Sequence, residues 1–154
     1  PGLFMLSLRS PQAIALELFE SSDIAHVQPR HRWPAREISG DCVFLNAQQA
    51  SSETQGRDAP RAQLGQEWWV FAVSGTGDAW LMSLDGQQHI GFLDHDDGPD
   101  AVATPMELNF GQWLQLADLL RQWEALNDEA FSALLTSLME QISPGLGLRY
   151  PYGL

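Results

Sequence analysis

The residues best suited to chemistry lie in one short stretch, GFLDHDDGPD, at positions 91–100. Carboxylates and an imidazole at this density fit three kinds of site. They could bind a metal ion, they could serve a hydrolase in which His95 acts as the base, or they could form an acidic surface for a basic partner. The four carboxylates belong to Asp94, Asp96, Asp97 and Asp100. Spacing and the charge of the rest of the chain have to separate these interpretations.

The spacing in this stretch does not match the common metal motifs. A calcium loop of the EF-hand type needs a glycine at its sixth position and a glutamate at its twelfth. With Asp94 at the first position, Gly98 falls at the fifth and Pro105 at the twelfth. The four histidines and the single cysteine show no zinc-ligand spacing either. We therefore predict no metal site and no cofactor.

A metal-dependent hydrolase remains an alternative, because His95 and the aspartates of residues 94–100 are types that hold magnesium and move protons. A nuclease must also hold a polyanion, however, and no arginine lies between Arg61 and Arg121. The chain contains no nucleophile elbow and no phosphate-binding loop. We therefore expect a protein that is not an enzyme.

The charge of the chain favours the acidic-surface interpretation. The formal net charge is −12, and the eight basic residues are all arginines. Residues 62–120 contain nine aspartates and glutamates and no arginine. Such a charge opposes binding to nucleic acid phosphates or to anionic lipid, and it favours a basic protein partner. We expect no nucleic acid partner and no membrane association.

Cysteine content and hydropathy indicate the compartment. Cys42 is the only cysteine, so the chain has no intramolecular disulfide, which is typical of a reducing environment. No apolar run approaches the roughly 18 residues that span a bilayer, and the first residues lack the pattern of a secretory signal. We expect a cytoplasmic protein.

Three apolar runs predict the centre of the fold. They lie at 68–73, 79–84 and 89–94, each is rich in aromatic and long aliphatic residues, and glycine-containing turns separate them. The Asp85-Gly86 pair is a strong hairpin signal. We predict three strands in an antiparallel meander.

Helices are predicted on both sides of this sheet. Ser10 and Pro11 open a short helix over residues 13–20, because serine caps free amides and proline is tolerated at the first helical position. Asn109 caps a second helix, and residues 128–143 form a third with an apolar stripe at three- and four-residue spacing. The predicted fold is therefore α+β, a central antiparallel meander flanked by N-terminal and C-terminal helices.

The remaining segments lack clear periodicity. Residues 26–40 are predicted to be irregular, and residues 46–66 are polar and free of aromatics, which is typical of an exposed loop. Residues 144–154 form a tail after the last helix. The chain contains no internal repeat and no linker between segments of different composition, so we predict one domain over residues 1–154.

Other residues that could do chemistry also have simple structural explanations. Gly75, Gly77 and Asp78 lie between two predicted strands, where glycines allow a tight turn. Trp113 falls on the apolar stripe of its helix, so packing explains it better than ligand stacking. A histidine at position 95 is more often held by hydrogen bonds than used in catalysis.

The succession of motifs between residues 70 and 123 resembles the SUKH superfamily, the Smi/Knr-like domains. Members show a G-x-G-D-like turn, a strand ending in a (W)DH(E/D)-like motif, and a helix beginning S-F-x-x-(F/W)-L. The chain departs from the pattern at Leu93, where the family often has tryptophan, and at Asn109, where it often has serine. The resemblance covers about a third of the chain. The matching segments are Gly75–Asp78, Asp94–Gly98 and Asn109–Leu114.

This resemblance implies a SUKH-like α+β fold without catalysis. Many bacterial members are immunity proteins that bind and neutralise a toxin, often a nuclease, and fungal members serve as interaction scaffolds. An immunity protein with a basic toxin partner is therefore the first functional hypothesis, and a regulatory scaffold without a toxin is a further alternative. The candidate partner surface is the acidic segment of Asp94, Asp96, Asp97 and Asp100. Within it, we expect Asp94 and His95 to fix the turn after the third strand by hydrogen bonds, leaving Asp96, Asp97 and Asp100 free to face the partner.

Overall fold

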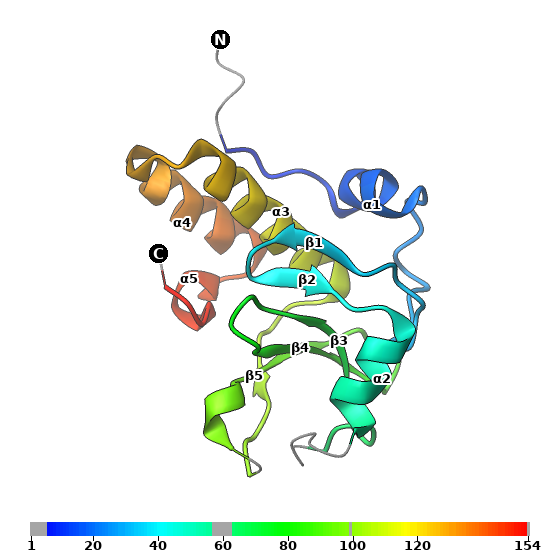
Figure 1. Cartoon of the computed structure of the whole chain (residues 1–154). Coiled ribbons are helices and arrows are strands. Elements are labelled where there is room, and N and C mark those ends of the chain that lie inside the picture. The colour runs from blue at the N-terminus through cyan, green and yellow to red at the C-terminus, as the bar shows by residue number, and fades with distance from the viewer. Residues whose placement is uncertain (1–5, 57–62, 99, 154) are drawn as a thin grey trace.

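The computed structural model describes residues 6–56, 63–98 and 100–153. The described residues form an α+β fold around one antiparallel sheet, whose strands follow one another in the order β1 to β6 (Figure 1). The strands are β1 (Arg36–Ser39), β2 (Cys42–Phe44), β3 (Trp68–Val73), β4 (Ala79–Ser83), β5 (Ile90–Leu93) and β6 (Thr104–Pro105). The predicted fold class and meander are confirmed.

The three predicted strands correspond to β3, β4 and β5. Gly77, with φ of 93°, lies in the turn between β3 and β4, and Gly86, with φ of 82°, lies in the turn between β4 and β5. Both glycines therefore supply the left-handed backbone that other residues adopt only with strain. The aromatic and aliphatic runs are buried along their length because the sheet is covered on both faces.

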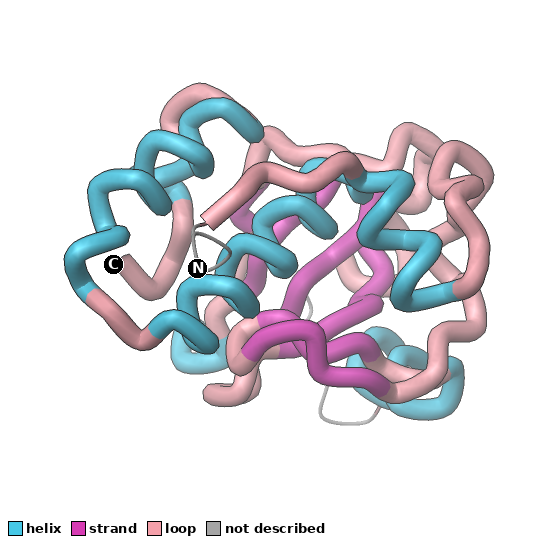
Figure 2. The backbone as a smooth tube through the Cα atoms, turned by 90° about the horizontal axis from the view of Figure 1, so that it is seen from above, coloured by secondary structure: helices cyan, strands magenta, loops and turns pink. Residues whose placement is uncertain are grey.

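Helix α3 (Phe110–Leu126) lies against one face of the sheet, and α1 (Pro11–Phe19) and α4 (Ser132–Ile142) pack against α3. Seen from above in Figure 2, the long helix α3 crosses in front of the strands. Their apolar stripes meet the aromatic side chains of the sheet in the main core. Trp113 of α3 packs edge-on against Phe44 and Phe71 with ring centroids 5.3 and 4.8 Å apart. The core stripe predicted for this helix is therefore a packing surface.

Side-chain caps begin two of these helices where the sequence predicts. The Ser10 hydroxyl accepts a hydrogen bond from the backbone N–H of Ala13 at 3.1 Å. At the start of α3, the Asn109 side chain accepts from the N–H of Gln112, whose side chain accepts in return from the N–H of Asn109. This reciprocal capping box satisfies two amides that the helix leaves free.

The segment predicted to be an exposed loop, 46–66, differs from the prediction. Residues Ala47–Gln55 form helix α2, which covers the second face of the sheet. Its start is a capping box between Asn46 and Gln49, and the buried Thr54 hydroxyl accepts from the N–H of Val70 at 2.9 Å. These contacts order a stretch whose polar composition resembles a loop. Residues 57–62 lie outside the described residues.

Two smaller differences lie at the ends of the fold. Part of the segment predicted to be irregular, 26–40, forms β1, which pairs with β2. The tail includes helix α5 (Leu146–Arg149), and Leu146 and Tyr150 are buried in the main core. The chain end therefore packs back onto the sheet, and it brings further side chains to the site described below.

Candidate functional site

The acidic stretch lies directly after β5, where the chain leaves the sheet. Residues His95–Asp97 form a single 3-10 turn, η1. The Asp94 side chain caps it, because its Oδ1 accepts a hydrogen bond from the N–H of Asp96 at 2.8 Å. The carboxylates that follow are therefore carried on a backbone of defined shape.

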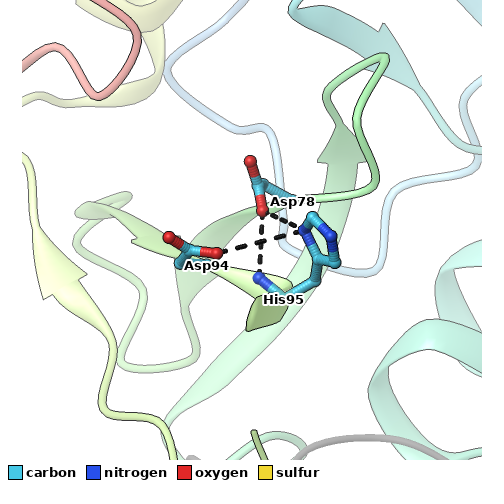
Figure 3. A group of neighbouring side chains, drawn as sticks. All are labelled: Asp78, Asp94 and His95. Carbon is cyan, nitrogen blue, oxygen red and sulfur yellow. Dashed lines mark hydrogen bonds and ion pairs between the residues drawn. The ribbon is translucent and has the colours of Figure 1, made fainter. Parts of the chain in front are cut away.

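Asp78 holds this turn from the neighbouring strand. Ala79 pairs with Leu93 across β4 and β5. Asp78, one step before β4, therefore comes close to His95, two steps after β5, although 17 positions separate them. Asp78 Oδ1 accepts hydrogen bonds from the backbone N–H of His95 at 2.9 Å and from its Nδ1 at 2.5 Å (Figure 3). One carboxylate oxygen therefore fixes both the backbone and the ring of His95.

The second oxygen of Asp78 has two further donors. Oδ2 accepts from the hydroxyl of Tyr152 at 2.6 Å and from the hydroxyl of Thr76 at 3.1 Å. The Asp78 side chain is only 8% exposed, and a buried carboxylate is tolerated where hydrogen bonds satisfy it. This network, called here the Asp78 network, consists of Asp78, Thr76, His95 and Tyr152. It ties the β3–β4 turn, η1 and the C-terminal segment together.

These contacts shift the pKa values of Asp78 and His95. Burial acts to raise the pKa of Asp78, but the hydrogen bonds from Tyr152, His95 and Thr76 outweigh burial and lower the pKa to about 2. The hydrogen bond to the Asp78 carboxylate raises the pKa of His95, whose side chain is 48% exposed. Asp78 is thus an anion at neutral pH, and it favours the protonated imidazole beside it.

The candidate partner residues lie on the outer side of the turn. Asp96, Asp97 and Asp100 are exposed, with 80% of the Asp96 side chain accessible, and Asp94 is half-exposed. Among the described residues, the ion pairs of these aspartates are with His95, from Asp96 at 3.2 Å and from Asp94 at 4.0 Å. The turn therefore presents a concentrated negative surface.

The two glycines of the turn before β4 have different roles. Gly77 supplies the positive φ, whereas Gly75 lies close to the turn between β1 and β2 and donates its N–H to the carbonyl of Gly40 at 2.8 Å. A Cβ at Gly75 would lie 3.0 Å from that carbonyl oxygen. The first glycine therefore allows a close approach between chain segments, which sequence spacing alone does not indicate.

Thr76 and Tyr152 were missed by the sequence reasoning. Thr76 lies inside the G-T-G-D motif. Its hydroxyl, two positions before Asp78, was the only local indication that it could donate a hydrogen bond to that carboxylate. Tyr152 lies in the segment predicted as a tail, 74 positions from its partner Asp78. Nothing in local periodicity predicts a contact over that separation.

Asp78, Asp94 and His95 could also hold a metal ion, because one ligand atom from each lies within 4.8 Å of the others. Two carboxylates and an imidazole are suitable ligands for several divalent ions. Two of the oxygens that would bind the metal nevertheless already accept hydrogen bonds. Asp78 Oδ1 accepts from the His95 ring, and Asp94 Oδ1 accepts the hydrogen bond that caps η1. Metal binding would have to compete with the bonds that shape the turn.

The same geometry lacks a hydrolytic relay of the serine-protease type among the described residues. Asp78 orients His95 through Nδ1, as the acidic member of a triad does. The other ring nitrogen, Nε2, faces the Asp96 carboxylate at 3.2 Å, where a triad would place the nucleophilic hydroxyl or thiol. The arrangement is suited to holding a turn in place.

Comparisons of the chain with protein-family models, with curated proteins and with solved structures gave no match. Within the described ranges, no helix combines the length and the apolar character needed to cross a membrane.

Proposed function

We propose that this protein is a non-enzymatic binding protein of the immunity type, which binds a basic toxin domain, such as a nuclease, and neutralises it in the cytoplasm. One observation carries the proposal. The η1 turn presents exposed carboxylates at Asp96 and Asp97 on a backbone that Asp78 holds from the next strand. A pre-ordered negative surface can mimic the polyanion that a basic nuclease binds, and it speeds association by electrostatic steering.

Two properties of the sequence support the same proposal. The net charge of −12 gives the whole molecule the sign that attracts a basic partner. The order of the G-T-G-D turn, the D-H-D-D turn and the N-F-G-Q-W-L helix start resembles the Smi/Knr-like domains. The cytoplasmic location rests on Cys42, which is a free thiol buried in the core and thus suits a reducing compartment.

The direct test uses as the partner the product of any toxin-like reading frame found next to the gene. The purified protein is expected to bind this product and to abolish its activity at equimolar concentration. The triple variant Asp96→Asn, Asp97→Asn, Asp100→Asn should neutralise less of the toxin at the same concentration. If wild-type protein neither binds nor inhibits any such candidate, the immunity proposal is wrong, and the regulatory-scaffold alternative gains support.

A matched control separates the acidic turn from net charge in general. Glu20, Glu37 and Glu129 are exposed and lie on other elements. Changing all three to glutamine removes three negative charges, the same number as the turn variant removes. The proposal requires the control to retain most of the binding that the turn variant loses.

The metal-dependent hydrolase is the second candidate, and the proximity of Asp78, Asp94 and His95 is the observation that favours it. Turnover of nucleotide or phosphoester substrates with Mg²⁺ or Mn²⁺, lost on His95→Gln, would establish it. We place it second because the potential ligand atoms already form the hydrogen bonds that shape the turn.

A further inference from the structure

A pocket at the other end of β5 is separate from the acidic turn. Its volume is about 590 Å³, and it lies beside Trp68, Ile90 and Leu108. Pockets of 300–1,000 Å³ with mainly apolar walls are typical of small-molecule sites. None of Asp94, Asp96, Asp97 or Asp100 lines it, so it needs an explanation beyond the proposed toxin binding.

The wall of the pocket contains an aromatic surface whose position is fixed. The ring of Trp68, in β3, extends over β4 and lies against Gly91 of β5. A Cβ at Gly91 would lie 3.1 Å from two atoms of the indole ring. The missing side chain therefore allows the ring to lie against the sheet. Pro105, which pairs with Gly91, extends the apolar wall on the same face, whereas the side chains of Ile90 and Leu108, which also border the pocket, are buried in the main core.

The rim of the pocket is negative. Glu67 precedes β3 and Asp85 follows β4, and the two strands pair through Trp68 and Ser83, so both carboxylates come to the same end of the sheet. Among the described residues neither takes part in an ion pair, whereas the third carboxylate of the rim, Glu107, is paired with Arg149 at 3.0 Å. Two negative charges therefore stand beside an apolar pocket.

Asp85 is held in position by its own turn. The Ser83 hydroxyl donates to Asp85 Oδ1 at 2.7 Å, and the N–H of Gln87 donates to the same oxygen at 2.9 Å. Ser83 also accepts from the N–H of His89 at 3.0 Å. The hydrogen bonds to Asp85 lower its pKa, so this carboxylate stays anionic across the neutral range.

We propose that this pocket binds a small organic cation, an ammonium or guanidinium group carried on an apolar or aromatic stem. The stem would lie against Trp68 and Pro105 while the cation meets Glu67 and Asp85. Tryptophan attracts cations through its π face, and apolar walls strengthen the attraction of nearby charges by excluding water. A free small molecule suits the volume better than one lysine or arginine side chain of a partner, which would leave much of it empty.

The test compares three probes that share one stem: 4-phenylbutylammonium, the neutral 4-phenylbutan-1-ol and the anionic 4-phenylbutyrate. Binding to the ¹⁵N-labelled full chain is followed by NMR at the indole N–H of Trp68, assigned with the variant Trp68→Phe. The buffer has a pH of about 8, where an ordinary histidine is neutral, and about 150 mM NaCl to screen distant charges. The ammonium probe should bind at least ~10-fold more tightly than the alcohol, and the carboxylate most weakly.

Two double variants separate the pocket from the general negative charge. Glu67→Gln with Asp85→Asn should reduce the affinity for the ammonium probe to that for the alcohol, while binding of the alcohol stays unchanged. Asp96→Asn with Asp97→Asn removes the same charge at the acidic turn and should keep the preference for the cation.

Three results would overturn the assignment. Equal affinities for the ammonium probe and the alcohol would show that the rim does not recognise charge. A Trp68 signal unmoved up to about 10 mM probe would show that the pocket is not a site of even weak affinity. If the two double variants lost the same amount of affinity for the ammonium probe, the preference for the cation would come from the net charge of the protein and not from the pocket. The toxin-binding test is unaffected by any of these results.

Discussion

Replacing Asp78 by asparagine should destabilise the fold in a way that depends on pH. Asparagine keeps the shape of the side chain, its oxygen can still accept from His95, and its amide can donate to the hydroxyls of Thr76 and Tyr152. The substitution therefore removes mainly the negative charge of a carboxylate that accepts four hydrogen bonds while only 8% exposed.

The size of the effect follows from the lowered pKa of Asp78. The folded value is about 2 against the ordinary 3.8, a difference of about 1.8 units at about 1.4 kcal/mol per unit. A lowered pKa contributes stability that is present above the unfolded value and lost as the pH falls through the folded value. Linkage gives about 2 kcal/mol at pH 5 and about 1 kcal/mol at pH 3.

Urea denaturation of wild type and Asp78→Asn at these two pH values measures the difference. Asp97→Asn is the control, because Asp97 is exposed on the same turn, and its loss should cost less than about 0.5 kcal/mol. A difference below about 0.5 kcal/mol for Asp78→Asn at pH 5, or one that does not shrink at pH 3, would refute the reasoning.

Further predictions concern the same network and the core. NMR titration of His95 should give a pKa above the ordinary value, and Asp78→Asn should lower it; an unchanged value would mean that Asp78 does not set it. Tyr152→Phe should lower the free energy of unfolding by about 1–2 kcal/mol in urea titrations, because a hydrogen bond to a buried carboxylate is lost; no change would show that the C-terminal contact is not formed in solution. Burial raises the pKa of Cys42 to about 12, so mass spectrometry should find this thiol unmodified by iodoacetamide until urea unfolds the chain, and rapid native alkylation would contradict its burial. Mg²⁺ or Zn²⁺ should leave the melting temperature unchanged within about 1 °C, because Asp94 Oδ1 already accepts the hydrogen bond that caps η1, and a large increase would favour the hydrolase.

The central strands could be predicted because their side chains all face packed layers. The run at 68–73 is apolar throughout and the run at 79–84 is apolar except for Ser83, which is typical of strands buried on both faces, and glycine turns mark their ends. Helix α3 could be predicted because its apolar stripe and its cap at Asn109 indicate the same start. Local signals sufficed where several of them agreed.

Helix α2 could not be predicted from hydrophobicity. Its sequence, AQQASSETQ, offers only Ala50 and Thr54 to the core, and tertiary contacts stabilise such a helix more than its own propensity does. The capping box formed by Asn46 and Gln49 was the one usable local signal. Strand β1 has only 4 residues, too few for a clear sequence pattern. Its pairing with β2 identifies it as a strand.

The candidate site could be predicted in part. The order of strand, turn and acidic stretch was enough to expect that Asp94 and His95 hold a turn. The partner of His95, Asp78, could not be deduced, because it depends on the register in which Ala79 meets Leu93. The contribution of Tyr152 depends on the path of the chain end, which no spacing rule fixes.

The central claim is that the fixed acidic turn steers a basic partner onto the protein. It is tested most directly by the association rate constant with the product of a toxin-like reading frame found next to the gene, measured by stopped flow at low and at moderate salt. Asp96→Asn, Asp97→Asn, Asp100→Asn should slow association at low salt by about 10-fold and weaken its salt dependence. The control at Glu20, Glu37 and Glu129 should change the rate far less. Equal rates for the wild type and the turn variant at every salt concentration would contradict the account.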